Sequence, residues 1–129
     1  MTDKTLKRVV LFGRFLAGDG STESTQDLKD KLRASAASRG YDVIEEFWEE
    51  EASPYTPLEE REALQSLMRS IWTQELRADA VFVADLTEFG WEDRHAQNTL
   101  LVFFEQNNVS IITYETIYDP EEWMTGYGL

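Results

Sequence analysis

The chain has 129 residues, no cysteine and a formal net charge of −13 at pH 7. The length suits one domain with a core of its own, and the lack of cysteine excludes disulfides, thiolate nucleophiles and cysteine metal sites. No apolar run approaches the roughly 18 residues of a membrane span, and no signal-peptide pattern is present. We therefore expect a cytoplasmic protein without a membrane association.

The negative charge is concentrated after residue 40. Residues 1–40 carry eight Lys and Arg against five Asp and Glu, whereas residues 41–129 carry four against twenty, a balance of −16. Such a surface repels the phosphates of a duplex or of an anionic membrane. Two interpretations stay open, an acidic surface that keeps the protein soluble and a surface that imitates DNA.

The first third of the chain predicts a strand followed by a helix. Residues 9–15 have the apolar content of a strand, and residues 22–25 offer several N-caps for a helix over 26–38. Gly40 is expected to end this helix in the left-handed conformation. The charged side chains of the helix, Lys29 and Arg33 among them, are expected to point away from the core. The predicted buried stripe comprises Leu28, Leu32 and Ala36.

A second strand is predicted over residues 41–48, and an acidic loop bounded by prolines over residues 49–57. Three consecutive glutamates begin this loop and raise the question of a metal site. The segment lacks the Asp-x-Asp-x-Asp-Gly pattern that turns oxygen ligands inward around a cation. No metal and no cofactor are predicted.

A second helix is expected to begin at Thr56, which can cap it, with Pro57 in the first turn and acids near the positive end of the dipole. Five apolar side chains at helical spacing predict its buried face, and we expect them to be core residues rather than ligands. They are Leu64, Leu67, Met68, Ile71 and Trp72.

The sheet is expected to be organised around residues 80–84, an apolar run flanked by Asp79 and Asp85. The run is too short for a buried helix and predicts a strand covered on both faces. A third helix over residues 92–107 and a strand over 109–115 follow, and the tail from residue 118 predicts a short helical start. The apolar face of the third helix comprises Ala96, Leu100, Phe103 and Phe104.

The alternation of strands and helices predicts an α/β fold, a single three-layer domain over residues 1–129. We expect a mostly parallel sheet of four to five strands with helices on both faces, and the strand at residue 80 central or next to central. In such sheets ligands lie outside the carboxyl ends of the strands, so chemistry is expected at that edge.

Four stretches, in order, resemble the catalytic domain of the serine recombinases, the resolvases and invertases. They are VVLFGRFL, LRASAASRGYDVIEEFWEEEAS, EEREALQSLM and ADAVFVADLTEFGWEDR leading into LLVFFEQNNVSII. The resemblance covers roughly residues 7–118 and implies a resolvase-like fold with a flavodoxin-like strand order. It also implies that the working groups lie after the first and third strands.

The resemblance places the nucleophile of the family at the end of the first strand, in the pattern Arg-x-Ser. The matching residues here are Arg14, Phe15 and Leu16, so the arginine is kept and a leucine stands at the nucleophile position. Ser21 or Ser24 would reach that position only if the loop were realigned.

A second family motif, Leu-Asp-Arg-x-Gly-Arg, matches residues 86–91 and has lost its working groups. Thr87 replaces the acid, and Glu88 and Trp91 replace the two arginines that hold the scissile phosphate. A further family arginine, at the start of the second helix, matches Arg61. Arg14 and Arg61 are therefore the candidate remnant of an anion site.

Phosphoryl transfer needs an activated oxygen nucleophile and cations that stabilise the charge on the phosphate. We therefore predict a catalytically inactive serine-recombinase-like domain rather than an enzyme, either a protein-interaction or regulatory module or a remnant of DNA recombination. The expected partner is an unidentified protein, with a recombinase-family protein as one candidate, and little or no direct nucleic-acid binding is expected. Only nine residues follow Pro120, where the resemblance places a long dimerisation helix and then a DNA-binding domain. We therefore expect a monomer or a weak dimer without that second domain.

Two enzyme-like readings compete with this one, alongside the acidic DNA mimic. The segment ELRADAVFVADL resembles a strand of the nucleoside deoxyribosyltransferases, whose carboxylate nucleophile would have to be Glu88 or Glu92 here. A phospho-receiver domain would need an acidic pair after the first strand and a lysine after the last, and both are missing. His95, the sole histidine, is expected to be a surface residue rather than a general base.

Overall fold

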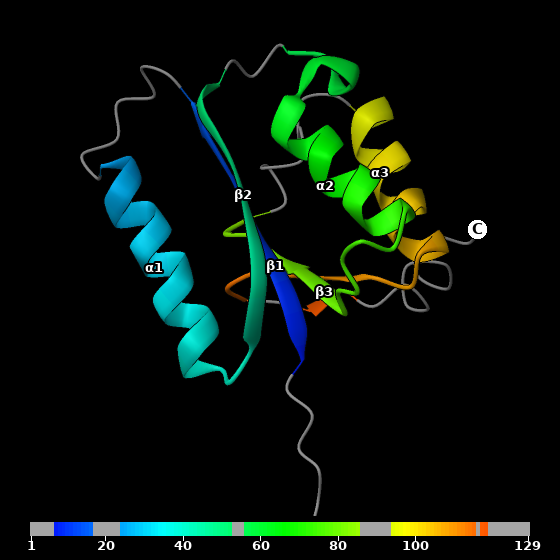
Figure 1. The fold of residues 1–129 in the computed structure, drawn as a ribbon. Coiled ribbons are helices and arrows are strands. Elements are labelled where there is room, and N and C mark those ends of the chain that lie inside the picture. The colour runs from blue at the N-terminus through cyan, green and yellow to red at the C-terminus, as the bar shows by residue number, and fades with distance from the viewer. Residues whose placement is uncertain (1–6, 17–23, 53–55, 86–93, 116, 119–129) are drawn as a thin grey trace, which may run out of the picture.

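The computed structural model describes residues 7–16, 24–52, 56–85, 94–115 and 117–118. The elements follow the expected alternation of strands and helices along the chain (Figure 1). In order they are β1 (Arg8–Leu16), α1 (Thr25–Ser38), β2 (Asp42–Ala52), the short 3-10 helix η1 (Leu58–Glu60), α2 (Glu62–Trp72), β3 (Ala80–Phe82), α3 (Arg94–Gln106), β4 (Ser110–Ile112) and β5 (Ile117–Tyr118).

The strands form one sheet in the order β2-β1-β3-β4-β5. The pairs β1–β2, β1–β3 and β3–β4 are parallel, and β5 is antiparallel to β4. The predicted α/β fold with a flavodoxin-like order is therefore confirmed, with β3 in the middle of the sheet.

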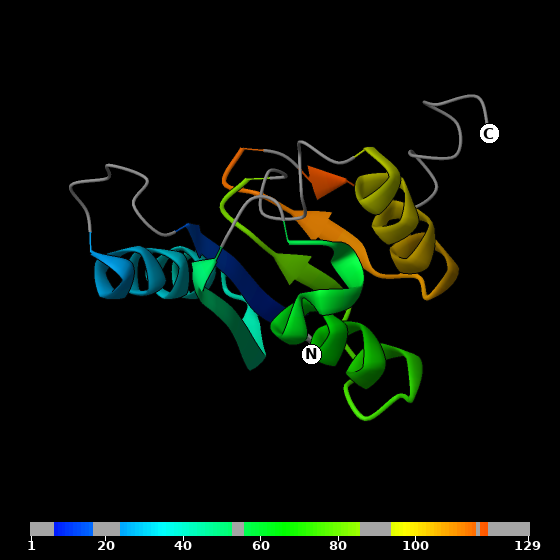
Figure 2. The same ribbon diagram turned by 90° about the horizontal axis from the view of Figure 1, so that it is seen from above.

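Helices cover both faces of the sheet, with α1 on one face and α2 and α3 on the other (Figure 2). The side chains of β1 alternate between the two faces, as the pleat of a strand requires. Val9 and Leu11 pack with Leu32 and Ala36 of α1. On the opposite face, Val10 and Phe12 belong to the larger cluster, together with Leu64, Leu67, Ile71, Leu100 and Phe104.

The ends of α1 agree with the expected capping residues, but the predicted start of the second helix is wrong. Helix α2 begins at Glu62 and not at Thr56, since the turn after Pro57 forms the separate short helix η1. The hydroxyl of Ser24, the N-cap of α1, accepts a hydrogen bond from the backbone N–H of Asp27 at 3.0 Å. Gly40 has a φ of +75° just past the end of this helix, which confirms the predicted left-handed residue. Asn108 adopts a φ of +55° shortly after α3.

The predicted loop at residues 49–52 is wrong, because β2 continues through these residues. β1 extends to Leu16, so Glu49 pairs with Arg14 and Ala52 pairs with Leu16. The register shifts between Arg14 and Leu16, so β2 accommodates one extra residue there. Cations on the two sides of the sheet offset the charges of Glu49 and Glu50. The strand propensity of glutamate alone could not reveal these long-range ion pairs.

The charged side chains of α1 also differ from expectation, because two of them point toward β2. Arg33 donates from Nε to Glu46 Oε2 at 2.8 Å and from Nη2 to Glu46 Oε1 at 2.6 Å. Lys29 Nζ lies 3.1 Å from Glu50 Oε1. Alternate residues of β2 face α1, and their carboxylates draw these cations over the strand.

The apolar face of α2 is buried at Leu64, Leu67 and Ile71, but Trp72 is 71% exposed and does not belong to the core. Trp72 is the last residue of the helix and lies about 100° around its axis from Ile71. The buried arc is complete without it, so the expected core position of Trp72 is corrected. None of the helices in the described ranges has the length and apolar character needed to cross a membrane.

Candidate functional site

Arg14 and Arg61 are both buried, at 7% and 4% exposure. Arg14 lies near the carboxyl end of β1 and continues the face formed by Val10 and Phe12. Arg61 directly precedes α2, and its guanidinium carbon lies 5.8 Å from the centroid of the Phe12 ring. Strand β1 and the start of α2 therefore bring the two arginines to the same face of the sheet.

Glu49 contacts Arg61 through its side chain and is paired with Arg14 through the register of the two strands. Its Oε1 accepts hydrogen bonds from Arg61 Nε at 3.0 Å and from Arg61 Nη2 at 2.7 Å. The side chains of Arg61 and Glu49 are only 3% and 9% exposed. Glu49 is also the cross-strand partner of Arg14, so the backbones of the two residues are neighbours in the sheet.

Glu49 is absent from the predicted site residues because the sequence favours a loop at residues 49–57. The signal that could have found it is the alternation of β2 carried beyond residue 48. Phe47 packs on the face of α2, so two residues further along the strand Glu49 returns to that face.

A pocket of about 280 Å³ opens beside Arg61. Four carboxylates and one guanidinium carry its charge, and Arg14 does not line it. The lining residues are Trp48, Glu49, Glu50, Thr56, Glu60, Arg61, Glu62 and Ala63. This pocket disfavours a phosphate-rich ligand, because the carboxylates outnumber the single cation.

Several positions singled out in the sequence lie wholly or partly outside the described residues. Thr87, Glu88 and Trp91 fall in the range 86–93, and Ser21 falls in the range 17–23. For Leu16 only the backbone is described, as part of β1. Arg14 and Arg61 are thus the predicted site residues whose side chains can be placed.

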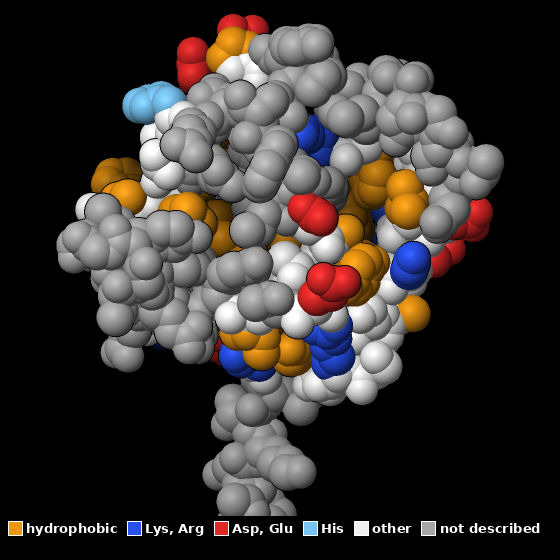
Figure 3. Space-filling view, turned by 180° about the vertical axis from the view of Figure 1, so that it is seen from behind, with side chains coloured by type: hydrophobic (Ala, Val, Ile, Leu, Met, Phe, Trp, Pro, Cys, Tyr) orange, Lys and Arg blue, Asp and Glu red, His pale blue; other side chains and the backbone are white. Residues whose placement is uncertain are grey.

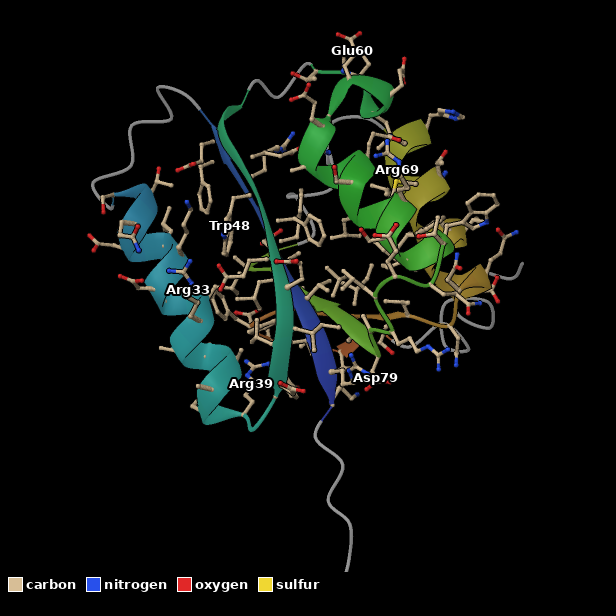
Figure 4. All side chains as sticks on the ribbon, in the orientation of Figure 1. Arg33, Arg39, Trp48, Glu60, Arg69 and Asp79 are labelled. Atoms are coloured by element: carbon tan, nitrogen blue, oxygen red, sulfur yellow. The ribbon has the colours of Figure 1, made fainter. Side chains whose placement is uncertain are left out.

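A second polar cluster lies on the opposite face, between α1 and β2, and is built around Trp48 (Figure 4). Its indole Nε1 donates to Glu46 Oε1 at 3.1 Å. Lys29 Nζ and Arg33 Cζ lie 5.5 Å and 5.7 Å from the ring centroid, which is cation–π distance. The hydrogen bonds from Arg33, and to a lesser extent from Trp48, lower the pKa of Glu46 although partial burial opposes this shift.

Gly13 is the residue that lets the Trp48 ring lie across β1. A Cβ atom at Gly13 would come within 2.9 Å of Phe15 Cζ and 3.0 Å of Trp48 Cε3. The rings of Phe15 and Trp48 pack at a centroid distance of 5.8 Å. The packed rings of Phe15 and Trp48 therefore support the strand ends next to Arg14 and Glu49. Their contacts stabilise the fold.

In the described part of the chain, the remaining candidate site residues do not form a cluster of reactive side chains. His95 is exposed near the start of α3. Within the described ranges, no three His, Cys, Asp or Glu side chains are grouped so that they could hold a metal ion. On the face seen in Figure 3, the visible carboxylates of described residues lie singly or in small groups among basic and apolar side chains.

Comparisons with known proteins agree with this fold. A family model described as "Resolvase, N terminal domain" matches residues 10–126. No curated protein matches the chain.

Three solved structures are similar in fold. The N-terminal catalytic domain of TP901-1 integrase has a TM-score of 0.69 at 23% identity, over 84% of this chain and 78% of that one. The C-terminal catalytic domain of ISC1926 TnpA, an IS607-like serine recombinase, has a TM-score of 0.67 at 20% identity, over 83% and 67% of the two chains. A resolvase family site-specific recombinase from Streptococcus pneumoniae has a TM-score of 0.67 at 20% identity, over 84% and 72%. The expected resemblance is confirmed, and the chain belongs to the resolvase family, whose N-terminal domain its residues 10–126 match.

Proposed function

We propose that this resolvase-family domain does not cleave DNA and acts as a protein-interaction or regulatory module. The observation that carries the proposal is the course of β1, which continues from Arg14 to Leu16 and stays paired with β2 across the register shift between these two residues. By the resemblance, the residue two positions after this arginine should supply the attacking oxygen. A leucine side chain has no atom that can attack a phosphate.

The hydroxyl of Ser24, an alternative nucleophile, has a structural role. It caps α1 by accepting the backbone N–H of Asp27 at 3.0 Å. Moving Ser24 into the position of Leu16 would remove this cap, which typically stabilises a protein by about 1 kcal/mol. The capping role supports the reading in which β1 ends without a nucleophile.

The charges around Arg61 also oppose phosphoryl transfer. The guanidinium is held by Glu49, and three further glutamates line the pocket. By the resemblance, Glu88 and Trp91 stand where two more arginines should stabilise the phosphate. Removing one such stabilising donor typically costs about 3 kcal/mol of transition-state stabilisation, a factor of ~10² in rate, so the loss of several leaves no measurable cleavage.

The ion pairs of β2 favour an interaction module over a DNA mimic. Glu46, Glu49 and Glu50 bind Arg33, Arg61 and Lys29 respectively. A surface that imitates DNA needs carboxylates that stand free for the basic residues of a partner, as the phosphates of a duplex do. These three carboxylates instead pair with two cations of α1 and with Arg61, which directly precedes α2.

The proposal is tested by a search for covalent protein–DNA adducts. The purified chain is incubated at low salt with supercoiled plasmid and with a random-sequence duplex pool, because electrostatic binding is strongest there. An active serine recombinase domain serves as the positive control, and Leu16→Ser serves as the variant that regains an oxygen. We expect neither adducts nor nicks from the wild type or the variant. A covalent DNA adduct of the wild type would refute the proposal and show that the protein is an active recombinase.

A further inference from the structure

Strand β2 places a carboxylate against the guanidinium that lines the pocket. Glu49 Oε1 receives both the Nε–H and the Nη2–H of Arg61, at 3.0 Å and 2.7 Å. We propose that Glu49 is a built-in anion that occupies Arg61 and keeps free oxyanions, such as phosphate and sulfate, out of the pocket. This inference rests on the proposed function only because both concern the same pocket beside Arg61.

The geometry makes Glu49 and an oxyanion competitors. The Nε–H and Nη–H groups of one guanidinium edge are the donors that an arginine presents to a carboxylate or to a phosphate. In this protein a single oxygen of Glu49 takes both donors of that edge. A phosphate oxygen can reach the same two donors only after the carboxylate has left them.

The fold fixes Glu49 in place, which gives it an advantage over any free ion. Glu49 lies within β2, in register with Arg14 of β1, and its side chain is only 9% exposed. An anion attached to the scaffold acts at a high effective concentration, because its translational freedom is already lost when the chain folds. A dissolved anion must give up that freedom on binding.

The rest of the pocket strengthens the exclusion. Glu50, Glu60 and Glu62 also line it, so an oxyanion that displaced Glu49 would still face carboxylates. Glu50 differs from Glu49 in two useful respects, since its carboxylate contacts Lys29 at 3.1 Å instead of Arg61 and its side chain is 57% exposed. The two residues therefore form a matched pair with the same charge, the same pocket and different partners.

The test compares Glu49→Gln with Glu50→Gln in the full chain. Binding of inorganic phosphate and of sulfate is measured by titration calorimetry at constant ionic strength, with chloride as the reference ion. We expect Glu49→Gln to bind phosphate at least about tenfold more tightly than the wild type, as expected when a charge-assisted hydrogen bond becomes available. We expect Glu50→Gln to bind like the wild type. The NMR signal of Arg61 Nε–H should shift on addition of phosphate in Glu49→Gln alone.

Three results would overturn the inference: equal phosphate binding by wild type and Glu49→Gln, an equal gain in both variants, or a folded Glu49→Gln that binds no anion. If Glu49→Gln does not fold in dilute buffer, its circular dichroism is measured with increasing sulfate. Folding restored by sulfate at concentrations too low for its general stabilising effect on proteins, and not by chloride, supports the inference, and a chain that stays unfolded in sulfate refutes it.

These outcomes are independent of DNA cleavage. A wild-type DNA adduct would refute the proposed function, but the phosphate titration would still test whether Glu49 excludes oxyanions from the pocket. Conversely, a Glu49→Gln variant without phosphate affinity would refute the role of Glu49 while the wild type still fails to cleave DNA.

Discussion

Replacing Gly13 with alanine tests the packing that supports the strand ends of the site. The added methyl carbon would lie 2.9 Å from Phe15 Cζ, which is closer than real Cβ contacts, and 3.0 Å from Trp48 Cε3 and Cζ3, which is tighter than nearly all of them. The Trp48 ring cannot move away without cost, because it donates to Glu46 at 3.1 Å. Overpacking of this kind costs typically about 1–3 kcal/mol. For a chain of this length each kcal/mol lowers Tm by about 4 °C.

The assay is thermal and urea unfolding followed by circular dichroism, with a second glycine and a rescue variant as controls. Gly40→Ala has no atom within 4 Å of the new methyl group, but it places an alanine at a φ of +75°. That cost, about 1 kcal/mol, comes from the backbone alone. Trp48→Leu should therefore reduce the cost of Gly13→Ala and leave the cost of Gly40→Ala unchanged. The steric argument would be refuted if Gly13→Ala had no effect on stability, or if its stability cost were undiminished in the Trp48→Leu background.

Two further predictions concern charge and exposure. Arg33 lowers the pKa of Glu46, so the folded state binds this proton more weakly than the unfolded state. The contribution of the pair is therefore present above about pH 4.5 and is lost as the pH falls through the lowered pKa. The Arg33 side chain is 40% exposed, so solvent screening keeps this contribution below about 1 kcal/mol. Urea unfolding from pH 7 to pH 3 should show a smaller loss of stability in Glu46→Gln than in the wild type, and equal losses would contradict the assignment. Trp72→Ser should change the free energy of unfolding by no more than about 0.5 kcal/mol, because Trp72 is 71% exposed. Ile71→Ala, the buried control, should lower the free energy of unfolding by about 2–5 kcal/mol. Equal losses of the two variants in chemical denaturation would show that Trp72 is covered.

The fold could be predicted from the sequence because its signals are local and periodic. The apolar run at residues 80–84 and the helical spacing of Leu64, Leu67 and Ile71 each describe one element facing one core. Alternating strands and helices with short connections then leave few topologies. The strand order itself came from the family resemblance, which the match to residues 10–126 confirms.

The errors arose where long-range contacts override local preference. Glu49 and Glu50 belong to a strand although glutamate disfavours strands, because Arg61 and Lys29 meet them from opposite faces of the sheet. Trp72 fits the apolar spacing of α2 but lies at the end of the helix and is exposed. The spacing of apolar residues alone cannot show that no other element covers this position.

The candidate site was predicted only in part. The resemblance singled out Arg14 and Arg61, and the structure places both on one face of the sheet. Their role as a remnant of an anion site stays a prediction. Glu49 could not be paired with Arg61 from the sequence, because their contact depends on the register of β2 against β1 and on the position of α2 above it.

The position of β1 in the sheet also bears on how the protein folds. One edge of β1 pairs with β2, which follows after a single helix, and the other edge pairs with β3, which follows after a second helix farther along the chain. Closing the shorter loop costs less chain entropy, so the β1-α1-β2 unit is favoured to form first. During synthesis this unit leaves the ribosome before Arg61 does, since domains are made from the N-terminus onward. We therefore expect the nascent chain to align Arg14 with Glu49 before Arg61 is available, and the arrival of α2 to complete and bury the ion pair between Arg61 and Glu49 that the folded structure shows.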